Sequence, residues 1–122
     1  MRLQKCEGND CGIVIEYKDK KEHIVESQIT DTHNLVTKEI VGTSKGISNT
    51  LITLHVKKVN VADLTMVDLP GITRVPVQGQ LEDIYEQIAK IIMQYISPNE
   101  TIIFNVLSST IDFPTYESIR ML

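Results

Sequence analysis

The fold of this chain is decided by the stretch Ala62-Asp63-Leu64-Thr65-Met66-Val67-Asp68-Leu69-Pro70-Gly71. It is a short apolar run that favours a strand and ends in an acid, a proline and a glycine. This order predicts a buried parallel strand over Leu64–Val67 that presents Asp68 at the carboxyl edge of a sheet, where phosphates bind in α/β folds. An aspartate there can help to hold a phosphate-bridging Mg²⁺, and a glycine lets the backbone approach a phosphate closely. The alternative interpretation of Asp68 is a carboxylate that caps or braces a loop.

The residues after Gly71 make the interpretation specific. They read Ile72-Thr73-Arg74-Val75-Pro76-Val77-Gln78-Gly79-Gln80 and lead into a helical pattern over about Leu81–Ile96. Together with the preceding strand, they resemble the third GTPase motif (68–71) and the second switch (about 68–80) of the dynamin superfamily of large GTPases. The resemblance is greatest to plant dynamin-related proteins of the Mx-like branch.

Other parts of the chain extend this resemblance to nearly its whole length. They are Tyr95–Ile103, Asp112–Arg120 and the opening Met1–Gln4, which is similar to the strand after the first switch of the family. The resemblance is loosest from about Cys6 to Asn49.

The resemblance implies an α/β fold: a partial dynamin-type GTPase domain of the P-loop NTPase kind over residues 1–122, with a mainly parallel sheet flanked by helices and no P-loop strand. It implies GTP and Mg²⁺ as the ligands of the complete family protein, which hydrolyses GTP. The residues that match the nucleotide-binding motif are Asp68, Leu69, Pro70 and Gly71. Asp68 would hold the metal through water, and the Gly71 amide would face the γ-phosphate.

The resemblance also implies partners. Thr73 and Arg74 would lie near the face through which two dynamin-type G domains pair, although the plain alternative is that both are solvated loop residues. The complete family protein would associate with membranes or microtubules. Nucleic acid is not an expected partner, because the net charge of −4 and the pI near 5.3 are opposite to a basic nucleic-acid surface.

Several motifs of a complete GTPase are missing from this sequence. No glycine is followed by Lys-Ser or Lys-Thr, as a P-loop requires, and Gly42-Thr43-Ser44-Lys45-Gly46 has the composition but not the order. We interpret Gly42 as the left-handed cap of a helix. Thr37-Lys38-Glu39-Ile40 lacks the aspartate of a guanine-reading motif. We therefore assign no catalytic residue and expect the chain not to bind GTP alone.

Two functional hypotheses follow. The first is a dynamin-related GTPase family member that is truncated and inactive alone, since phosphoryl transfer needs all these parts together. The alternative is a catalytically silent remnant, or an interaction module that pairs with an intact dynamin relative.

Composition adds further expectations. No apolar run approaches the roughly 20 residues of a membrane span, and no apolar region follows the basic start, so we expect a cytoplasmic protein. Cys6 and Cys11 are interpreted as two reduced loop thiols, and the three histidines as ordinary surface residues.

The remaining pattern predicts alternating strands and helices, which is typical of an α/β domain. The predicted elements are a strand over Gly12–Tyr17, a turn over Lys18–Lys21, a helix over about Glu22–Val41, a strand over Leu51–Lys57, a strand over Thr101–Val106 and a final helix near Pro114.

Overall fold

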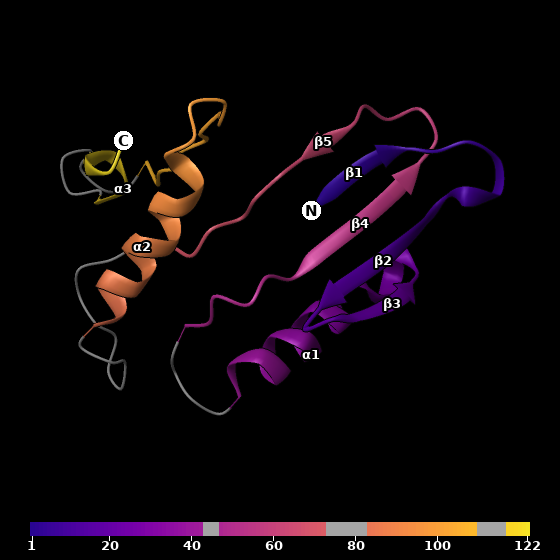
Figure 1. Cartoon of the computed structure of the whole chain (residues 1–122), viewed down its shortest axis with the longest axis horizontal. Coiled ribbons are helices and arrows are strands. Elements are labelled where there is room, and N and C mark those ends of the chain that lie inside the picture. The colour runs from indigo at the N-terminus through magenta and orange to yellow at the C-terminus, as the bar shows by residue number, and fades with distance from the viewer. Residues whose placement is uncertain (43–46, 73–82, 110–116) are drawn as a thin grey trace. The chain divides into compact units, whose positions relative to one another are not determined.

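The computed structural model describes residues 1–42, 47–72, 83–109 and 117–122 (Figure 1). The helices and strands of this part of the chain are β1 (Arg2–Lys5), β2 (Gly12–Tyr17), β3 (Lys20–Ile24), α1 (Ile29–Val41), β4 (Thr53–Lys58), β5 (Leu64–Thr65), α2 (Ile84–Ile96) and α3 (Glu117–Arg120). Short 3₁₀ turns lie at Gly8–Asp10 and Glu26–Gln28. The chain divides into two compact units: Met1–Ser44 with Ser48–Asp68, and Lys45–Ile47 with Leu69–Leu122.

The first unit is built on a five-stranded sheet with the order β3-β2-β4-β1-β5. β1 and β4 run parallel, whereas β2 is antiparallel to β3 and β4, and β5 is antiparallel to β1. The α/β fold class is confirmed. The expectation of a mainly parallel sheet is wrong for the described strands, because β2 and β3 follow each other through a two-residue turn, which can join only antiparallel strands.

That turn consists of Lys18 and Asp19. Both residues have positive φ angles, 43° and 63°. Two consecutive residues with positive φ form the tight hairpin turn whose twist matches that of the flanking strands. Tyr17 and Lys20 face each other directly beside the turn, so the predicted polar turn over Lys18–Lys21 is shorter than expected, and its second half starts β3.

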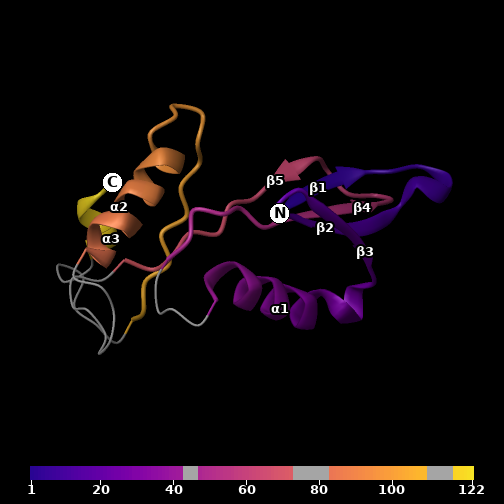
Figure 2. The same ribbon diagram turned by 60° about the horizontal axis from the view of Figure 1, so that its bottom comes forward.

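The core of the first unit lies between the sheet and α1, which covers one sheet face (Figure 2). Side chains of a strand alternate between the two faces, so the buried residues of β2 are every second one. The core residues are Ile13, Ile15 and Tyr17 from β2, Ile24 from β3, Val36 from α1 and Val56 from β4. Ile15 is the most deeply buried of them, at 1% exposure.

The helix expected over Glu22–Val41 begins later, at Ile29. Residues Glu22 to Ile24 are instead the end of β3, where pairing with β2 provides backbone hydrogen bonds that an isolated helical turn cannot match. The Gln28 side chain accepts a hydrogen bond from the Val25 N–H at 3.1 Å, which closes the 3₁₀ turn before the helix.

The helix ends at Gly42, as expected. Gly42 has φ 67° and ψ −146°, and its N–H donates to the Lys38 carbonyl at 2.8 Å. The positive φ favours glycine, although the ψ angle lies outside the left-handed helical region that the sequence suggested.

The second unit contains α2 and α3. The α2 helix confirms the amphipathic pattern over 81–96 from Ile84 onward, and buries Ile84 and Ile88; Leu81 and Glu82 lie outside the described residues. It ends at Ser97, whose hydroxyl and N–H both donate to the Met93 carbonyl. The final helix begins at Glu117, and Pro114 lies outside the described residues.

The strand expected over Thr101–Val106 is absent: the described residues form no ladder there. Its apolar side chains lie in solvent, with Phe104 at 90% and Val106 at 91% exposure. A β-prone sequence needs a neighbouring strand to supply backbone partners, and none of the described strands pairs with this segment.

The expectation of a buried parallel strand over Leu64–Val67 is also wrong. β5 covers only Leu64–Thr65, lies at the edge of the sheet and runs antiparallel to β1. Leu64 is 52% exposed and Val67 49%. A central strand needs a neighbour along both edges and cover on both faces, whereas the described residues give β5 the single neighbour β1.

Candidate functional site

The candidate site is the segment Asp68-Leu69-Pro70-Gly71, which follows β5. The backbone pairing of β1 and β5 continues one residue past Thr65, since the Met66 N–H donates to the Met1 carbonyl at 2.9 Å and the Met1 ammonium donates to the Met66 carbonyl at 2.7 Å. Asp68 lies two residues beyond this anchor and is exposed. Its carboxylate makes no hydrogen bond or ion pair with the described residues.

Asp68 acts electrostatically on the amino terminus. Burial and the nearby Arg2 charge lower the pKa of the Met1 ammonium, while the carboxylate of Asp68 acts in the opposite direction. The carboxylate therefore lies near enough to the start of β1 for its charge to act there. It is an available oxygen ligand with a negative charge, which is the kind of group that Mg²⁺ binds.

The other acid of this stretch, Asp63, has a structural role. Its Oδ1 accepts a hydrogen bond from the Lys5 N–H at 2.8 Å, at the end of β1. The two carboxylates on either side of β5 are both exposed, but Asp63 accepts a hydrogen bond that braces the strand, whereas Asp68 has no such partner among the described residues. The loop-bracing alternative raised for Asp68 describes Asp63 instead.

Leu69 is half-buried, whereas Pro70 and Gly71 are exposed. Gly71 does not have a positive φ angle, and a Cβ atom added there would meet no atom within 4 Å. Neither the backbone conformation nor the packing of the described residues therefore requires glycine at this position. Close approach of a ligand to the backbone is a reason that remains for it.

Asp68 ends the sheet unit and Leu69 belongs to the second unit, so the motif continues in sequence across the boundary between them. Thr73 and Arg74, the residues expected near a pairing face, lie outside the described residues, as do the other switch residues up to Gln80.

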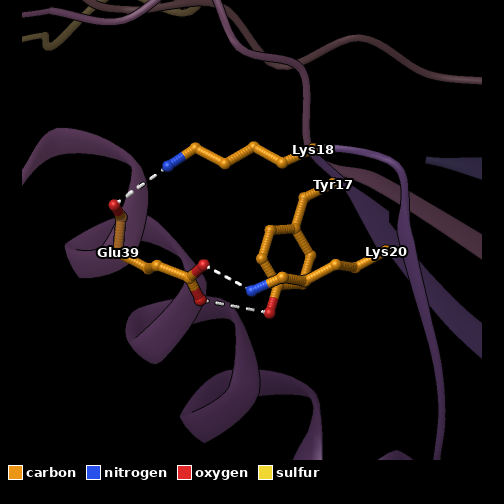
Figure 3. Close-up of polar contacts among 4 residues, drawn as sticks. All are labelled: Tyr17, Lys18, Lys20 and Glu39. Atoms are coloured by element: carbon orange, nitrogen blue, oxygen red, sulfur yellow. Dashed lines mark hydrogen bonds and ion pairs between the residues drawn. The ribbon is translucent and has the colours of Figure 1, made fainter.

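Sequence reasoning missed a polar cluster at the hairpin end of β2 (Figure 3). Glu39 of α1 accepts hydrogen bonds from the Lys20 Nζ at 2.7 Å and from the Tyr17 hydroxyl at 3.3 Å, and its backbone carbonyl accepts one from the Lys18 Nζ at 3.2 Å. The hydrogen bond from Lys20 lowers the pKa of Glu39, and the same bond raises the pKa of Lys20. Burial raises the pKa of Tyr17, with Glu39 adding to it.

This cluster attaches α1 to the β2–β3 hairpin. Its polar groups bind one another, so we interpret the cluster as structural. The sequence held one signal, because several lysines beside a tyrosine at a turn favour an acidic partner. Which acid takes that place depends on how α1 packs against the hairpin.

A second pair also escaped the sequence. The Nε2 atom of His55 lies 2.8 Å from Glu16 Oε2, across β4 and β2, and Lys21 Nζ is 3.5 Å from the other carboxylate oxygen. The hydrogen bond with His55 is the largest cause of a lowered pKa of Glu16. His55 is therefore a paired residue rather than the ordinary surface histidine that was expected.

The interpretation of Cys6 and Cys11 as reduced thiols is wrong, because the two form a disulfide. They close the connection between β1 and β2, which both pair with β4 and so bring the two sulfur atoms to the same end of that strand.

The described residues hold neither a metal-binding cluster nor a helix that could span a membrane. No group of three or more His, Cys, Asp or Glu side chains could hold a metal ion there. No helix among these residues combines the length and apolar character that crossing a membrane requires.

Comparison with known proteins identifies the family. A family profile described as the dynamin family matches residues 1–121. The chain is 56% identical over 121 residues to Dynamin-related protein 4C of Arabidopsis thaliana, covering 99% of this chain and 18% of that protein. It is also 56% identical over 121 residues to Putative dynamin-related protein 4A of Arabidopsis thaliana, covering 99% of this chain and 40% of that protein.

A more distant relative is the Interferon-induced GTP-binding protein Mx2 of Oncorhynchus mykiss, which is 40% identical over 121 residues, covering 97% of this chain and 19% of that protein. The chain thus spans between 18% and 40% of the length of these relatives. A profile match over almost the whole chain, together with Asp68-Leu69-Pro70-Gly71 after a strand, shows that this chain belongs to the dynamin family.

Proposed function

We propose that this chain is the segment of a GTP-binding dynamin-type G domain that contacts the metal and the γ-phosphate. The observation that carries the proposal is the exposed carboxylate of Asp68, which pairs with none of the described residues and lies three residues before a glycine with open space around it. Asp68 would hold Mg²⁺ through water, and the backbone of Leu69, Pro70 and Gly71 would approach the phosphate.

In this role the chain supplies one part of a GTP-hydrolysing site. Mg²⁺ bound with GTP would neutralise negative charge on the phosphates. The phosphate-cradling Gly-x-x-x-x-Gly-Lys-Ser/Thr sequence does not occur in residues 1–122. We therefore propose hydrolysis for the complete G domain and not for this segment by itself.

The proposal extends to partners and place. Pairing with another dynamin-type G domain through Thr73 and Arg74, action in the cytoplasm, and association of the complete protein with membranes or microtubules follow from family membership as hypotheses. The name of the Oncorhynchus mykiss relative, a GTP-binding protein, supports the nucleotide part of the proposal.

A chimera tests the proposal. The matched 121 residues of Arabidopsis Dynamin-related protein 4C are replaced by this chain, and Mg²⁺-dependent GTP hydrolysis is measured beside the unchanged host. We expect the chimera to retain the activity of the host. Asp68→Asn should then lower it by about tenfold to a hundredfold, the usual effect of disturbing an outer-sphere metal partner.

The matched control is Asp63→Asn, which removes the same charge on the other side of β5 but keeps an oxygen that accepts the Lys5 N–H. Gly71→Ala adds a second arm: its Cβ has room in the structure, so lost binding of a fluorescent GTP analogue with unchanged thermal stability would report the phosphate rather than the fold. Full activity and unchanged Mg²⁺ dependence of Asp68→Asn would refute the proposal.

A further inference from the structure

The Cys6–Cys11 disulfide lies in the connection between β1 and β2, at one end of the sheet. β1 and β2 flank β4 on either side, so the residues that connect them pass the carboxyl end of β4 (Figure 1). The bond closes this connection over a sequence separation of 5, with the Cα atoms 5.5 Å apart.

The two cysteines differ in access. Cys6 is buried, at 5% exposure, and its N–H donates to the Lys58 carbonyl at 3.1 Å. Cys11 is exposed and lies directly before β2. Thiol–disulfide exchange requires an incoming thiolate to reach one of the two sulfur atoms, so access alone favours attack at Cys11.

The fold around the bond has other support. The Cys6–Lys58 hydrogen bond holds one end of the connection, and the Lys57 Nζ–Asp10 Oδ2 ion pair at 3.0 Å holds its middle. The ladders of β1 and β2 with β4 continue on both sides. A bond that spans few residues also restricts the unfolded chain less than one that spans many. Opening this bond should therefore loosen residues 7–10 and leave the sheet in place.

We propose that Cys6–Cys11 is a reversible thiol–disulfide exchange site that a protein dithiol opens at Cys11. The dithiol's thiolate attacks the Cys11 sulfur, the Cys6–Cys11 bond breaks, and Cys6 leaves as a thiolate that takes up a proton. The second thiol of the partner, deprotonated, then attacks the mixed disulfide and releases Cys11 as a thiolate. The partner is oxidised by two electrons, and this chain is reduced to two thiols.

This assignment rests on the sheet and the cysteines, and it is independent of nucleotide binding. The proposed cytoplasmic location adds further support: in a reducing compartment, disulfides are usually transient and redox-sensing rather than permanent. An exposed cysteine bonded to a buried one, in a loop that other contacts hold, fits that class.

A trapping experiment on the unaltered 122-residue chain tests the site. The probe is a protein dithiol with a Cys-x-x-Cys motif whose second cysteine is replaced by serine, so that the mixed disulfide persists. Cleavage after Glu7 separates the Cys6 peptide from the Cys11 peptide, and mass spectrometry shows which one carries the probe. We expect the Cys11 peptide. A mixed disulfide at Cys6, or none under native conditions with trapping only after denaturation, would overturn the proposal.

Hydrogen exchange supplies the second arm. After reduction by the unmodified dithiol, amides of residues 7–11 should exchange at least about tenfold faster, whereas the paired amides of β2 and β4 stay protected. Loss of protection throughout the sheet would mean a purely structural bond and would contradict the inference.

Two single variants check the difference in access. In Cys6→Ser the remaining Cys11 thiol should react quickly with an aromatic disulfide reagent, and in Cys11→Ser the remaining Cys6 thiol slowly. Equal rates in folded variants would remove the basis for attack at Cys11.

Discussion

Met1 and Met66 are joined by two backbone hydrogen bonds, of 2.9 Å and 2.7 Å, that extend the antiparallel pairing of β1 and β5. These hydrogen bonds fix the position of the backbone just before the motif Asp68–Gly71. They hold the strand of the motif against β1 only two residues before Asp68, and they leave the outer edge of β5 without a partner strand among the described residues. The Asp68 carboxylate therefore follows the edge strand of the sheet and not a central strand.

The core makes the first prediction. Ile15→Ala should lower the free energy of unfolding by about 3 kcal/mol, because it removes buried methyl groups and leaves a cavity, whereas Ile15→Val should lower it by about 1 kcal/mol. Urea unfolding of the 122-residue chain measures both. A similar loss for the two variants would contradict the burial of Ile15 at 1% exposure.

The Glu39 cluster predicts a pH dependence. The hydrogen bond from Lys20 holds the pKa of Glu39 below its ordinary value, near 4.5, so Glu39 binds fewer protons in the folded state. Its stabilising effect is thus fully present above the unfolded-state pKa and is lost as pH falls through the lower, folded-state pKa.

A double-mutant cycle of Lys20→Gln and Glu39→Gln, measured by urea unfolding, should show favourable coupling at pH 7 that declines below the ordinary pKa of glutamate. Both side chains are well exposed, so the coupling should be small. Coupling that grows on acidification would have the wrong sign.

The Glu16–His55 pair makes a prediction about titration. Since the hydrogen bond with His55 is the largest cause of the lowered pKa of Glu16, His55→Ala should raise that pKa toward its ordinary value. Lys21→Ala, which removes a weaker contact at 3.5 Å, should raise it less. Carbon-detected NMR of the Glu16 carboxyl follows both titrations, and the reverse order would show that charge rather than the hydrogen bond dominates.

The disulfide predicts a modest stability effect. Replacing both cysteines by serine should lower the free energy of unfolding by roughly 2 kcal/mol, as expected when a short closed loop is opened in the unfolded chain. Denaturant unfolding of the oxidised chain and the double variant tests this. Complete loss of folding would show that the β1–β2 connection depends on the bond.

The alternative role as an interaction module also makes a prediction. A large excess of the chain should mildly inhibit phosphate release by an intact plant dynamin-related GTPase, because no phosphate contact in this chain selects the active state of its second switch. Arg74→Ala should abolish the inhibition, and Arg120→Ala should retain it. Stimulation would contradict the expected direction, and no change would eliminate the module.

The sequence by itself determined those features that are local in the chain. The order Asp68-Leu69-Pro70-Gly71, together with the residues that follow it, indicated the family. The alternation in Gly12–Tyr17 indicated β2, and the helical period indicated α2 from Ile84 onward. Each of these signals lies within one segment, because periodicity and turn chemistry are properties of neighbouring residues.

Only the tertiary structure decided which distant segments meet. Leu64–Val67 and Thr101–Val106 have sequences that favour strands, yet the first gives a short exposed edge and the second forms no strand, because a strand's burial depends on its neighbours. The same reason applies to Glu39 with Lys20, which meet because α1 packs against the sheet. Cys6 and Cys11 are close in the sequence, but the pairing of β1 and β2 with β4 is what brings them together.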